Sequence, residues 1–213
     1  MTTATPATTW TYRSSTDPVM TAQPTRLATA LIAHADQKPR ERVLLYSMVF
    51  ALAPRRCLEI GVRWGGGSRI IHAALSDLGQ GVLVGVDPAP AIEFDWSLIA
   101  DRAHLVTGAS PEALPRAADL AGGLFDFVFI DGDHSEHGCK ADLEGVIPFT
   151  ETGATILLHD AYHPPVAKAI QGVLDTGAPL TDCGLLATTL NNGVHVESGR
   201  TVPYGGVRML RRT

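Results

Sequence analysis

The chain has 213 residues, 45% of them hydrophobic, and a formal net charge of −5. This length and composition suit one globular domain, and an acidic balance without a basic stripe argues against nucleic acid as a partner. The cysteines at 57, 139 and 183 are spaced for neither a zinc site nor a disulfide framework. No apolar run is long enough to span a bilayer and no secretory signal pattern opens the chain, so we expect a cytoplasmic protein without membrane contact.

The N-terminal quarter of the sequence divides into a tail and two helices. Residues 1–24 are rich in Thr, Ala, Ser and Pro without periodicity, which predicts a flexible tail. Helical apolar spacing follows over 25–35 and, after Pro39, over 40–52. We expect residues 25–54 to form a helical cover on a domain that spans 25–213, and these helices to be the surface through which copies of the chain could associate.

From residue 57 onward, short apolar runs alternate with helical patterns. This alternation predicts βαβ units and therefore an α/β fold: a doubly wound, Rossmann-like, mostly parallel seven-stranded sheet. Two late apolar runs separated by a turn predict a C-terminal antiparallel hairpin. The predicted strands are 57–60, 81–86, 104–106, 125–130, 154–158, 184–190 and 206–210, the turn is 191–193, and the predicted helices are 68–78, 90–101, 111–121 and 135–147.

A glycine-rich segment follows the first predicted strand. It contains Glu59, Gly61 and a run of three glycines that ends immediately before Ser68. Strand, glycine-rich turn and helix together bring backbone amides close to a ligand, and glycine permits both the approach and a positive φ. A carboxylate at Glu59 would repel a phosphate and attract an ammonium group. The segment therefore favours a nucleoside that carries an amino acid.

Polar side chains stand at the carboxyl ends of five successive predicted strands. In open α/β sheets, ligands bind in the crevice outside these ends. The constellation is more specific than any single motif within it. It comprises Glu59, Asp87, Ser110, Asp131 with Asp133 and His134, and His159 with Asp160.

Two of these positions have a ligand-binding interpretation and a structural one. Asp87 can accept hydrogen bonds from the two hydroxyls of a ribose, or it can serve as a helix N-cap. Ser110 can border an adenine, or it can cap the helix that Pro111 opens, and these two roles are compatible.

The acids and histidines after the fourth and fifth predicted strands indicate chemistry. Carboxylates this close together repel unless a proton or a cation bridges them. Asp131 and Asp160 could hold one divalent ion, since Mg²⁺ often takes only one or two protein carboxylates. Alternatively, Asp160 caps the next segment and Asp131 orders its loop. His134 and His159 are candidate general bases, with His134 preferred.

These motifs resemble those of class I S-adenosylmethionine-dependent methyltransferases. The matching residues extend from Cys57 to Asp160. Within the class, the chain is similar to small-molecule O-methyltransferases that include macrolide-sugar and other natural-product enzymes and are related in fold to catechol O-methyltransferases. The motifs that carry this resemblance are Cys57-Leu-Glu-Ile-Gly61, Ile130-Asp-Gly-Asp-His-Ser135, Ala141-Asp-Leu143 and Leu158-His-Asp160.

The resemblance implies a binding role for each matching residue. S-adenosylmethionine would contact Glu59, Gly61, Gly65, Ser68, Asp87, Ala109, Ser110 and Asp131. A divalent metal, with Mg²⁺ preferred, would bind Asp131 and Asp160. Ser68 stands one place later than the usual hydroxyl, and Ala161 replaces the asparagine that follows the second metal acid in catechol enzymes.

The activity that the resemblance implies is methyl transfer to a hydroxyl of a small molecule, such as a sugar or a natural-product intermediate. Two alternatives remain at this point: an NAD(P)-dependent Rossmann oxidoreductase, in which Asp87 would also suit the ribose, and a protein that binds S-adenosylmethionine without catalysis. The glycine-rich loop lacks the G-x-G-x-x-G spacing of the first alternative.

Overall fold

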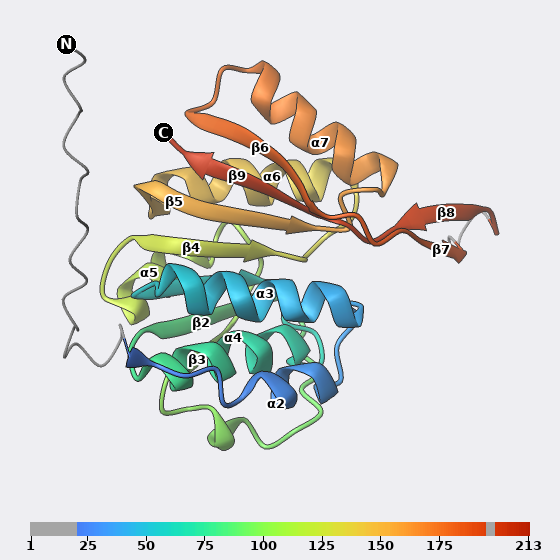
Figure 1. Cartoon of the computed structure of the whole chain (residues 1–213). Coiled ribbons are helices and arrows are strands. Elements are labelled where there is room, and N and C mark those ends of the chain that lie inside the picture. The colour runs from blue at the N-terminus through green and yellow to red at the C-terminus, as the bar shows by residue number, and fades with distance from the viewer. Residues whose placement is uncertain (1–20, 195–198) are drawn as a thin grey trace, which may run out of the picture.

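A computed structural model describes residues 21–194 and 199–213. Its centre is a seven-stranded sheet of order β3-β2-β1-β4-β5-β9-β6, in which β9 alone runs antiparallel to its neighbours (Figure 1). This arrangement confirms the predicted fold class. The strands are β1 (Arg56–Ile60), β2 (Val82–Asp87), β3 (Ala103–Thr107), β4 (Phe125–Ile130), β5 (Thr150–His159), β6 (Leu180–Ala187) and β9 (Val207–Arg212).

Helices cover both faces of the sheet, each on its own hydrophobic cluster. One face carries α2 (Leu27–Ile32), α3 (Pro39–Leu52) and α4 (Gly66–Leu78), which lie in front of the sheet in Figure 1. The other carries α5 (Leu114–Ala121), α6 (Glu136–Val146) and α7 (Pro164–Asp175). Successive strand residues point to opposite faces, so that Cys57 belongs to the first cluster and Leu58 to the second.

The predicted helix over 90–101 is wrong. The structure has an irregular segment there, with one short 3₁₀ turn at Trp96–Leu98. Pro88 and Pro90 deprive the segment of two backbone donors, which opposes helix formation. Its apolar side chains pack on the loop and helix that follow β1. For example, the Arg69 guanidinium stacks over the Phe94 ring, with its carbon Cζ 5.3 Å from the ring centroid.

The predicted turn at 191–193 is also wrong, because these residues are part of a strand. β7 (Asn191–Val194) pairs with β8 (Thr201–Tyr204) in a separate two-stranded sheet. This hairpin connects β6 to β9 and projects from the body of the molecule (Figure 1). The chain re-enters the body at Gly205 and Gly206, whose φ angles of +83° and +80° suit glycine.

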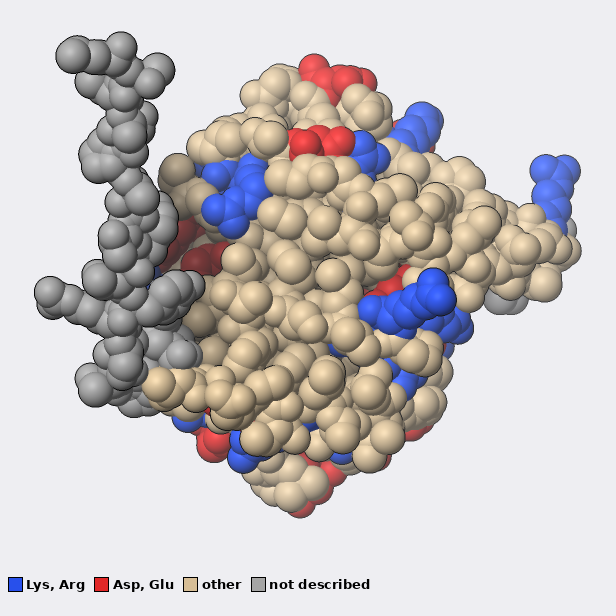
Figure 2. All heavy atoms as spheres, in the orientation of Figure 1, with Lys and Arg blue, Asp and Glu red and all other residues tan. Residues whose placement is uncertain are grey.

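The predicted tail of residues 1–24 lies, up to residue 20, outside the described residues. On the face shown in Figure 2, Lys and Arg stand in small separate groups rather than in a continuous band. Within 21–194 and 199–213, no helix has the length and apolarity that a membrane crossing requires.

Candidate active site

A cavity of about 840 Å³ opens at the carboxyl ends of the parallel strands. Its walls come from the segment between α2 and α3, the loops after β1, β2, β3, β4 and β5, and the β7–β8 hairpin. Most of the predicted site residues line this one cavity. Glu59, Gly61, Asp87, Ala109, Ser110, Asp131, His134, His159 and Asp160 line the cavity, whereas Gly65 and Ser68 do not.

The loop after β1 is built around Gly61. Its φ is +87°, and a Cβ there would lie 2.2 Å from the carbonyl oxygen of Asp131. The ends of β1 and β4 are joined at this point, since the Asp131 amide donates to the Ile60 carbonyl over 2.8 Å. Only glycine therefore lets the two strand ends meet beneath the cavity. Gly65 (φ +85°) is the N-cap of α4 and packs below Phe94 instead.

Glu59 is a buried acid beneath this loop, with 1% of its surface exposed. Burial raises the pKa of its carboxyl to about 8, and the neighbouring Asp131 and Asp87 add to that effect. The Ser68 hydroxyl donates to one carboxylate oxygen, so Ser68 supports Glu59 rather than reaching the cavity. Gly67 leaves room for the other oxygen, because a Cβ there would lie 2.1 Å from it. Glu59 has no ion-pair partner within the described residues, which suits a ligand that brings a cation.

Asp87 ends β2 and is held by backbone amides. Its carboxylate accepts from the amides of Val62 (2.9 Å), Arg63 (2.8 Å) and Ala89 (2.7 Å). No helix begins here, so the N-cap interpretation is wrong for Asp87. Ser110 does not cap a helix either, because the N-cap of α5 is Ala113. Asp142, which sequence reasoning did not assign to the site, also lines this part of the cavity, and burial raises its pKa to about 6.

Two acids and two histidines meet where β4 and β5 end. His159 Nδ1 lies 3.0 Å from Asp131 Oδ1 and 3.3 Å from Asp160 Oδ2. His134 Nε2 lies 2.7 Å from Asp160 Oδ2 and 3.5 Å from Asp131 Oδ1. The topology brings them together, because β4 and β5 are parallel neighbours whose last residues share one edge. Asp160 adopts a φ of +52°, a left-handed conformation that an aspartate tolerates at low cost.

A second layer of residues, which sequence reasoning missed, orients this cluster. Gln37 Nε2 donates to Asp131 Oδ2 over 2.5 Å, and the Gly205 amide donates to Asp160 Oδ1 over 2.5 Å. Glu41 Oε2 lies 3.2 Å from His159 Nε2, while Glu41 Oε1 accepts from the Gly206 amide over 2.9 Å. The only local signal was Glu41 as the third residue of a helix, where its carboxylate accepts from the backbone amide of the N-cap residue Lys38 over 2.8 Å.

The four charges of the cluster support one another. Burial alone would lower the pKa of His134, but Asp131 and Asp160 outweigh it and raise the pKa to about 10. Burial opposes the charge on His159 too, yet Asp131, Asp160 and Glu41 hold its pKa well above the usual range. Burial would raise the pKa of Asp160, and the two imidazoles reverse this and lower it. With no other cation present, both histidines are therefore imidazolium at neutral pH.

The donor set of the cluster fits a divalent metal. One atom from each of Asp131, His134, His159 and Asp160 lies within 4.8 Å of the others, and Asp131 Oδ1 and Asp160 Oδ2 both face His159 Nδ1. Ala161 is buried and offers no ligand. Two carboxylates therefore form the oxygen part of the set, and any third protein ligand comes from a histidine.

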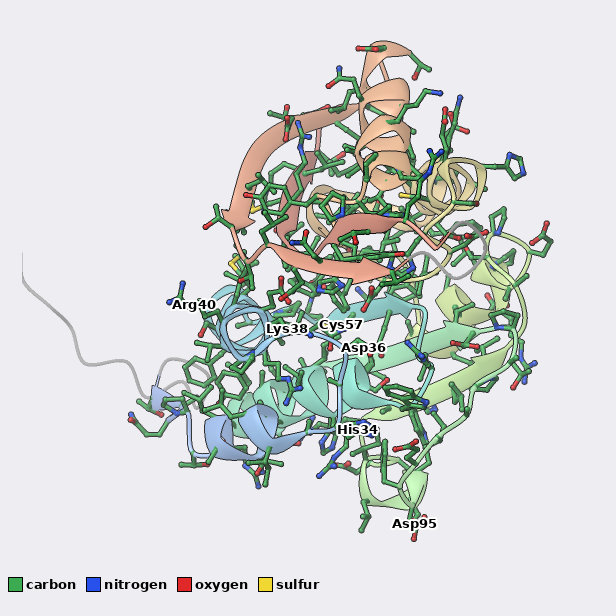
Figure 3. The ribbon with its side chains drawn as sticks, turned by 90° about the vertical axis from the view of Figure 1, so that its right-hand side faces the viewer. His34, Asp36, Lys38, Arg40, Cys57 and Asp95 are labelled. Atoms are coloured by element: carbon green, nitrogen blue, oxygen red, sulfur yellow. The ribbon has the colours of Figure 1, made fainter. Side chains whose placement is uncertain are left out.

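The segment between α2 and α3 closes one side of the cavity. Figure 3 looks from the end to which β4 and β5 point and shows His34, Asp36 and Lys38 along this segment. Arg42 fastens it, because its guanidinium donates to the carbonyls of Leu31 (2.9 Å), Ala33 (2.7 Å), Ala35 (2.7 Å) and Gln37 (2.6 Å). We name residues 33–38 the strap. The strap passes so close to α4 that a Cβ on Gly66 would lie 2.2 Å from the His34 carbonyl oxygen.

The chain is similar to methyltransferases in sequence and in structure. A catechol O-methyltransferase of Mycobacterium tuberculosis (strain ATCC 25618 / H37Rv) is 32% identical over 143 residues, which are 62% of this chain and 63% of that relative, just under two thirds of its length. An O-methyltransferase from Bacillus cereus, solved with SAH, superposes with a TM-score of 0.62 at 19% identity over 93% of this chain and 92% of its own. The O-methyltransferase TomG from Streptomyces achromogenes, solved with SAM, superposes with a TM-score of 0.57 at 20% identity, over 94% of this chain and 91% of its own.

The strand order and these structural likenesses show that the chain has the fold of these methyltransferases. Residues 58–161, just under half of the chain, match the family described as "Methyltransferase domain". The matched segment contains every predicted cavity-lining residue, from Glu59 to Asp160. These similarities favour methyl transfer over the oxidoreductase alternative.

Proposed function

We propose that this protein is an S-adenosylmethionine-dependent O-methyltransferase that acts on a hydroxyl of a small molecule. One observation carries the proposal. A single cavity joins a buried, unpaired acid beneath a glycine-rich loop to a cluster of two acids and two histidines. The first part suits the cationic amino-acid end of the cofactor, and the second suits an acceptor hydroxyl. The crystallised relatives with SAM or SAH, and the tomaymycin-synthesis role stated for TomG, support this assignment.

The cofactor would lie across the ends of β1, β2 and β4. Glu59 would attract its ammonium group, Gly61 would allow its close approach, and Asp87 would accept from a ribose hydroxyl. A carboxylate offers about four lone-pair sites, and backbone amides occupy three of those on Asp87, which leaves one for the ribose. Ala109 and Ser110 would border the adenine, with Asp142 beside them.

His134 is the candidate base, for a geometrical reason. Its side chain is 37% exposed, whereas that of His159 is 4% exposed and has carboxylates at both ring nitrogens. The His134 ring is therefore the imidazole that an acceptor can approach, while its Nε2 atom is buried against Asp160 and Asp131. A base needs a free lone pair, and the acids that raise the His134 pKa to about 10 remove it at neutral pH. A bound divalent cation would neutralise those acids and make a coordinated hydroxyl more acidic.

In the proposed reaction the chain positions the reactants and handles one proton. S-adenosylmethionine supplies an electrophilic methyl group. The acceptor oxygen forms a bond to the methyl carbon as the bond from carbon to sulfur breaks, and the hydroxyl proton passes to the imidazole of His134. Asp131 and Asp160 would hold the metal and with it the acceptor oxygen. Because the donor is already activated, alignment accounts for much of the rate.

The proposal is tested by separating binding from turnover. We expect His134→Gln and Asp160→Asn each to lower methyl transfer about 100-fold or more, the usual contribution of a positioned base. The probes are an aromatic diol, 3,4-dihydroxybenzoate, and a methyl glycoside, with formation of S-adenosylhomocysteine as the readout. Calorimetry should show S-adenosylhomocysteine affinity within about threefold of wild type in both variants. His137→Gln, on an exposed residue of α6, is the matched control.

Two outcomes would contradict the proposal. Absence of any binding of S-adenosylmethionine would remove its cofactor half. Binding without turnover toward any hydroxylated acceptor would favour the non-catalytic alternative. Equal turnover in wild type, His134→Gln and Asp160→Asn would displace the catalytic site from this cluster.

A further inference from the structure

We propose that His159 is the third protein ligand of the metal, and that its nitrogen makes the site selective for a transition metal such as Mn²⁺, Co²⁺ or Zn²⁺ over Mg²⁺. Glu41 is the positioning residue that sets His159 for this role. The inference rests on the proposed function for the presence of a metal, and it adds the ligand, the metal class and the part played by helix α3.

The first step concerns which ring nitrogen of His159 carries a proton. His159 Nε2 lies 3.2 Å from Glu41 Oε2, and the Glu41 side chain is only 1% exposed. Both carboxylate oxygens of Glu41 also accept from backbone amides, Oε2 from Lys38 over 2.8 Å and Oε1 from Gly206 over 2.9 Å. A carboxylate only accepts, so Nε2 must donate. This hydrogen bond orients the ring and leaves Nδ1 directed at the acids.

The second step concerns what faces Nδ1. The outer oxygens of both acids are satisfied, Asp131 Oδ2 by Gln37 and Asp160 Oδ1 by Gly205. The inner oxygens, Asp131 Oδ1 and Asp160 Oδ2, lie 3.0 Å and 3.3 Å from Nδ1. Without a metal, a proton on Nδ1 lies between these oxygens. A metal ion that displaces this proton would meet three ligand atoms, one nitrogen and two carboxylate oxygens, converging on one place. Ligands about 2.1 Å from one ion stand at similar separations from each other.

The third step concerns the kind of cation. Mg²⁺ prefers oxygen ligands and dehydrates reluctantly, whereas an imidazole suits first-row transition metals. The position that could supply an amide oxygen after Asp160 is Ala161, which cannot coordinate. The protein therefore completes the site with a nitrogen. An imidazole that donates its other N–H to a carboxylate is a common second-shell arrangement, and loss of that carboxylate typically weakens metal binding 10- to 100-fold.

The test measures metal binding without an acceptor. Chelator-treated protein is titrated with Co²⁺, followed by its visible d–d absorption, and with Zn²⁺ and Mg²⁺ by calorimetry. We expect wild type to bind Co²⁺ and Zn²⁺ at least 100-fold more tightly than Mg²⁺. His159→Asn, which replaces the nitrogen by an amide oxygen, should reduce that ratio below about tenfold. Glu41→Gln should weaken Co²⁺ binding about 10- to 100-fold, and Glu112→Gln, on an exposed acid, should leave it unchanged.

The results separate this inference from the proposed function. Equal affinity for Mg²⁺ and Zn²⁺ in wild type, or no binding of any ion, overturns the inference; the second result means that a proton occupies the place between the acids. These measurements need only folded wild-type protein, so they stand even if Glu41→Gln fails to fold. Metal selectivity as expected, together with absent methyl transfer, would refute the proposed function alone. Methyl transfer together with equal affinity for Mg²⁺ and Zn²⁺ would refute the inference alone.

Discussion

At the scale of single residues, Glu59 connects the stability of the fold to its function. The carboxyl is completely buried and has a pKa raised to about 8, because it lies in a low-dielectric environment near two other acids. A group whose pKa is raised on folding stabilises the protein fully below its unfolded pKa and loses that contribution as the pH rises through the folded value. Ionisation of Glu59 is therefore unfavourable until a ligand brings a positive charge.

We predict that Glu59→Gln stabilises the ligand-free protein at pH 9 and weakens cofactor binding. The amide keeps the contact with Ser68 and removes a buried charge. We therefore expect the free energy of unfolding to rise by about 1.5 kcal/mol, which corresponds to roughly 3–6 °C in Tm for a chain of this size. Affinity for S-adenosylhomocysteine should fall at least tenfold. Thermal denaturation and calorimetry check the two effects, and a lower Tm with unchanged affinity would contradict the role given to Glu59.

The site residues that could be predicted are those that follow strands. Asp131 and Asp160 come directly after apolar runs, and parallel topology alone brings such residues to one edge. Glu41 and Gln37 could not be found in this way. They lie 118 and 94 residues from their partners in the cluster, and locally they read as the start of a helix. Ser68 was predicted at the cofactor, but its hydroxyl is directed to the buried Glu59.

At the scale of elements, the sequence predicts the sheet better than its irregular connections. Buried strands are marked by continuous apolar runs, and helices by apolar periodicity, so both are readable locally. Residues 90–101 also carry apolar side chains at suggestive spacing, yet these pack on the glycine loop and α4 rather than in a helix of their own. Tertiary packing decides the conformation of such segments, and the local sequence does not show which distant residues they will pack against.

The strap offers a prediction at this scale. Arg42→Met removes three hydrogen bonds to strap carbonyls and a fourth to the Leu31 carbonyl of α2, and a hydrogen bond to a charged group contributes about 1.5–3 kcal/mol. We expect faster hydrogen exchange over residues 33–38 and five- to tenfold weaker binding of S-adenosylhomocysteine. Mass spectrometry of exchange and calorimetry are the measurements. Arg40→Met, on an exposed residue of the same helix, is the control, and equal exchange in the two variants would refute the fastening role.

At the scale of the whole molecule, the buried cluster sets the pH range of greatest stability. The pKa values of Asp131, Asp160 and Glu41 are lowered on folding, so their contribution is present above their unfolded pKa values and is lost as the pH falls. The pKa of His134 is raised to about 10, so its contribution is complete below its usual value of 6.5 and is lost as the pH rises toward 10. The two effects overlap between about pH 4.5 and 6.5.

We therefore expect chelator-treated protein to be most stable near pH 6, and to lose free energy of unfolding on both sides. Urea denaturation at pH 4, 6 and 9 measures this. His134→Gln should reduce the difference between pH 6 and 9, because it removes one raised pKa, whereas the exposed His104→Gln should not. A wild-type stability that rises steadily from pH 6 to 9 would contradict the charge states assigned to the cluster.

The place of β9 between β5 and β6 has a consequence for the order in which the protein can be made. Glu41 and Asp160 are each held by an amide of the Gly205–Gly206 pair, which immediately precedes β9, and Gly206 lies 165 residues after Glu41. A ribosome completes nearly the whole sheet before it reaches these glycines. Until then β5 and β6 have no strand between them, and Asp160 and Glu41 lack the amides of Gly205 and Gly206. Synthesis thus delays assembly of the site until β9 has emerged, so that a nascent chain interrupted before β9 has neither a complete sheet nor an ordered cluster.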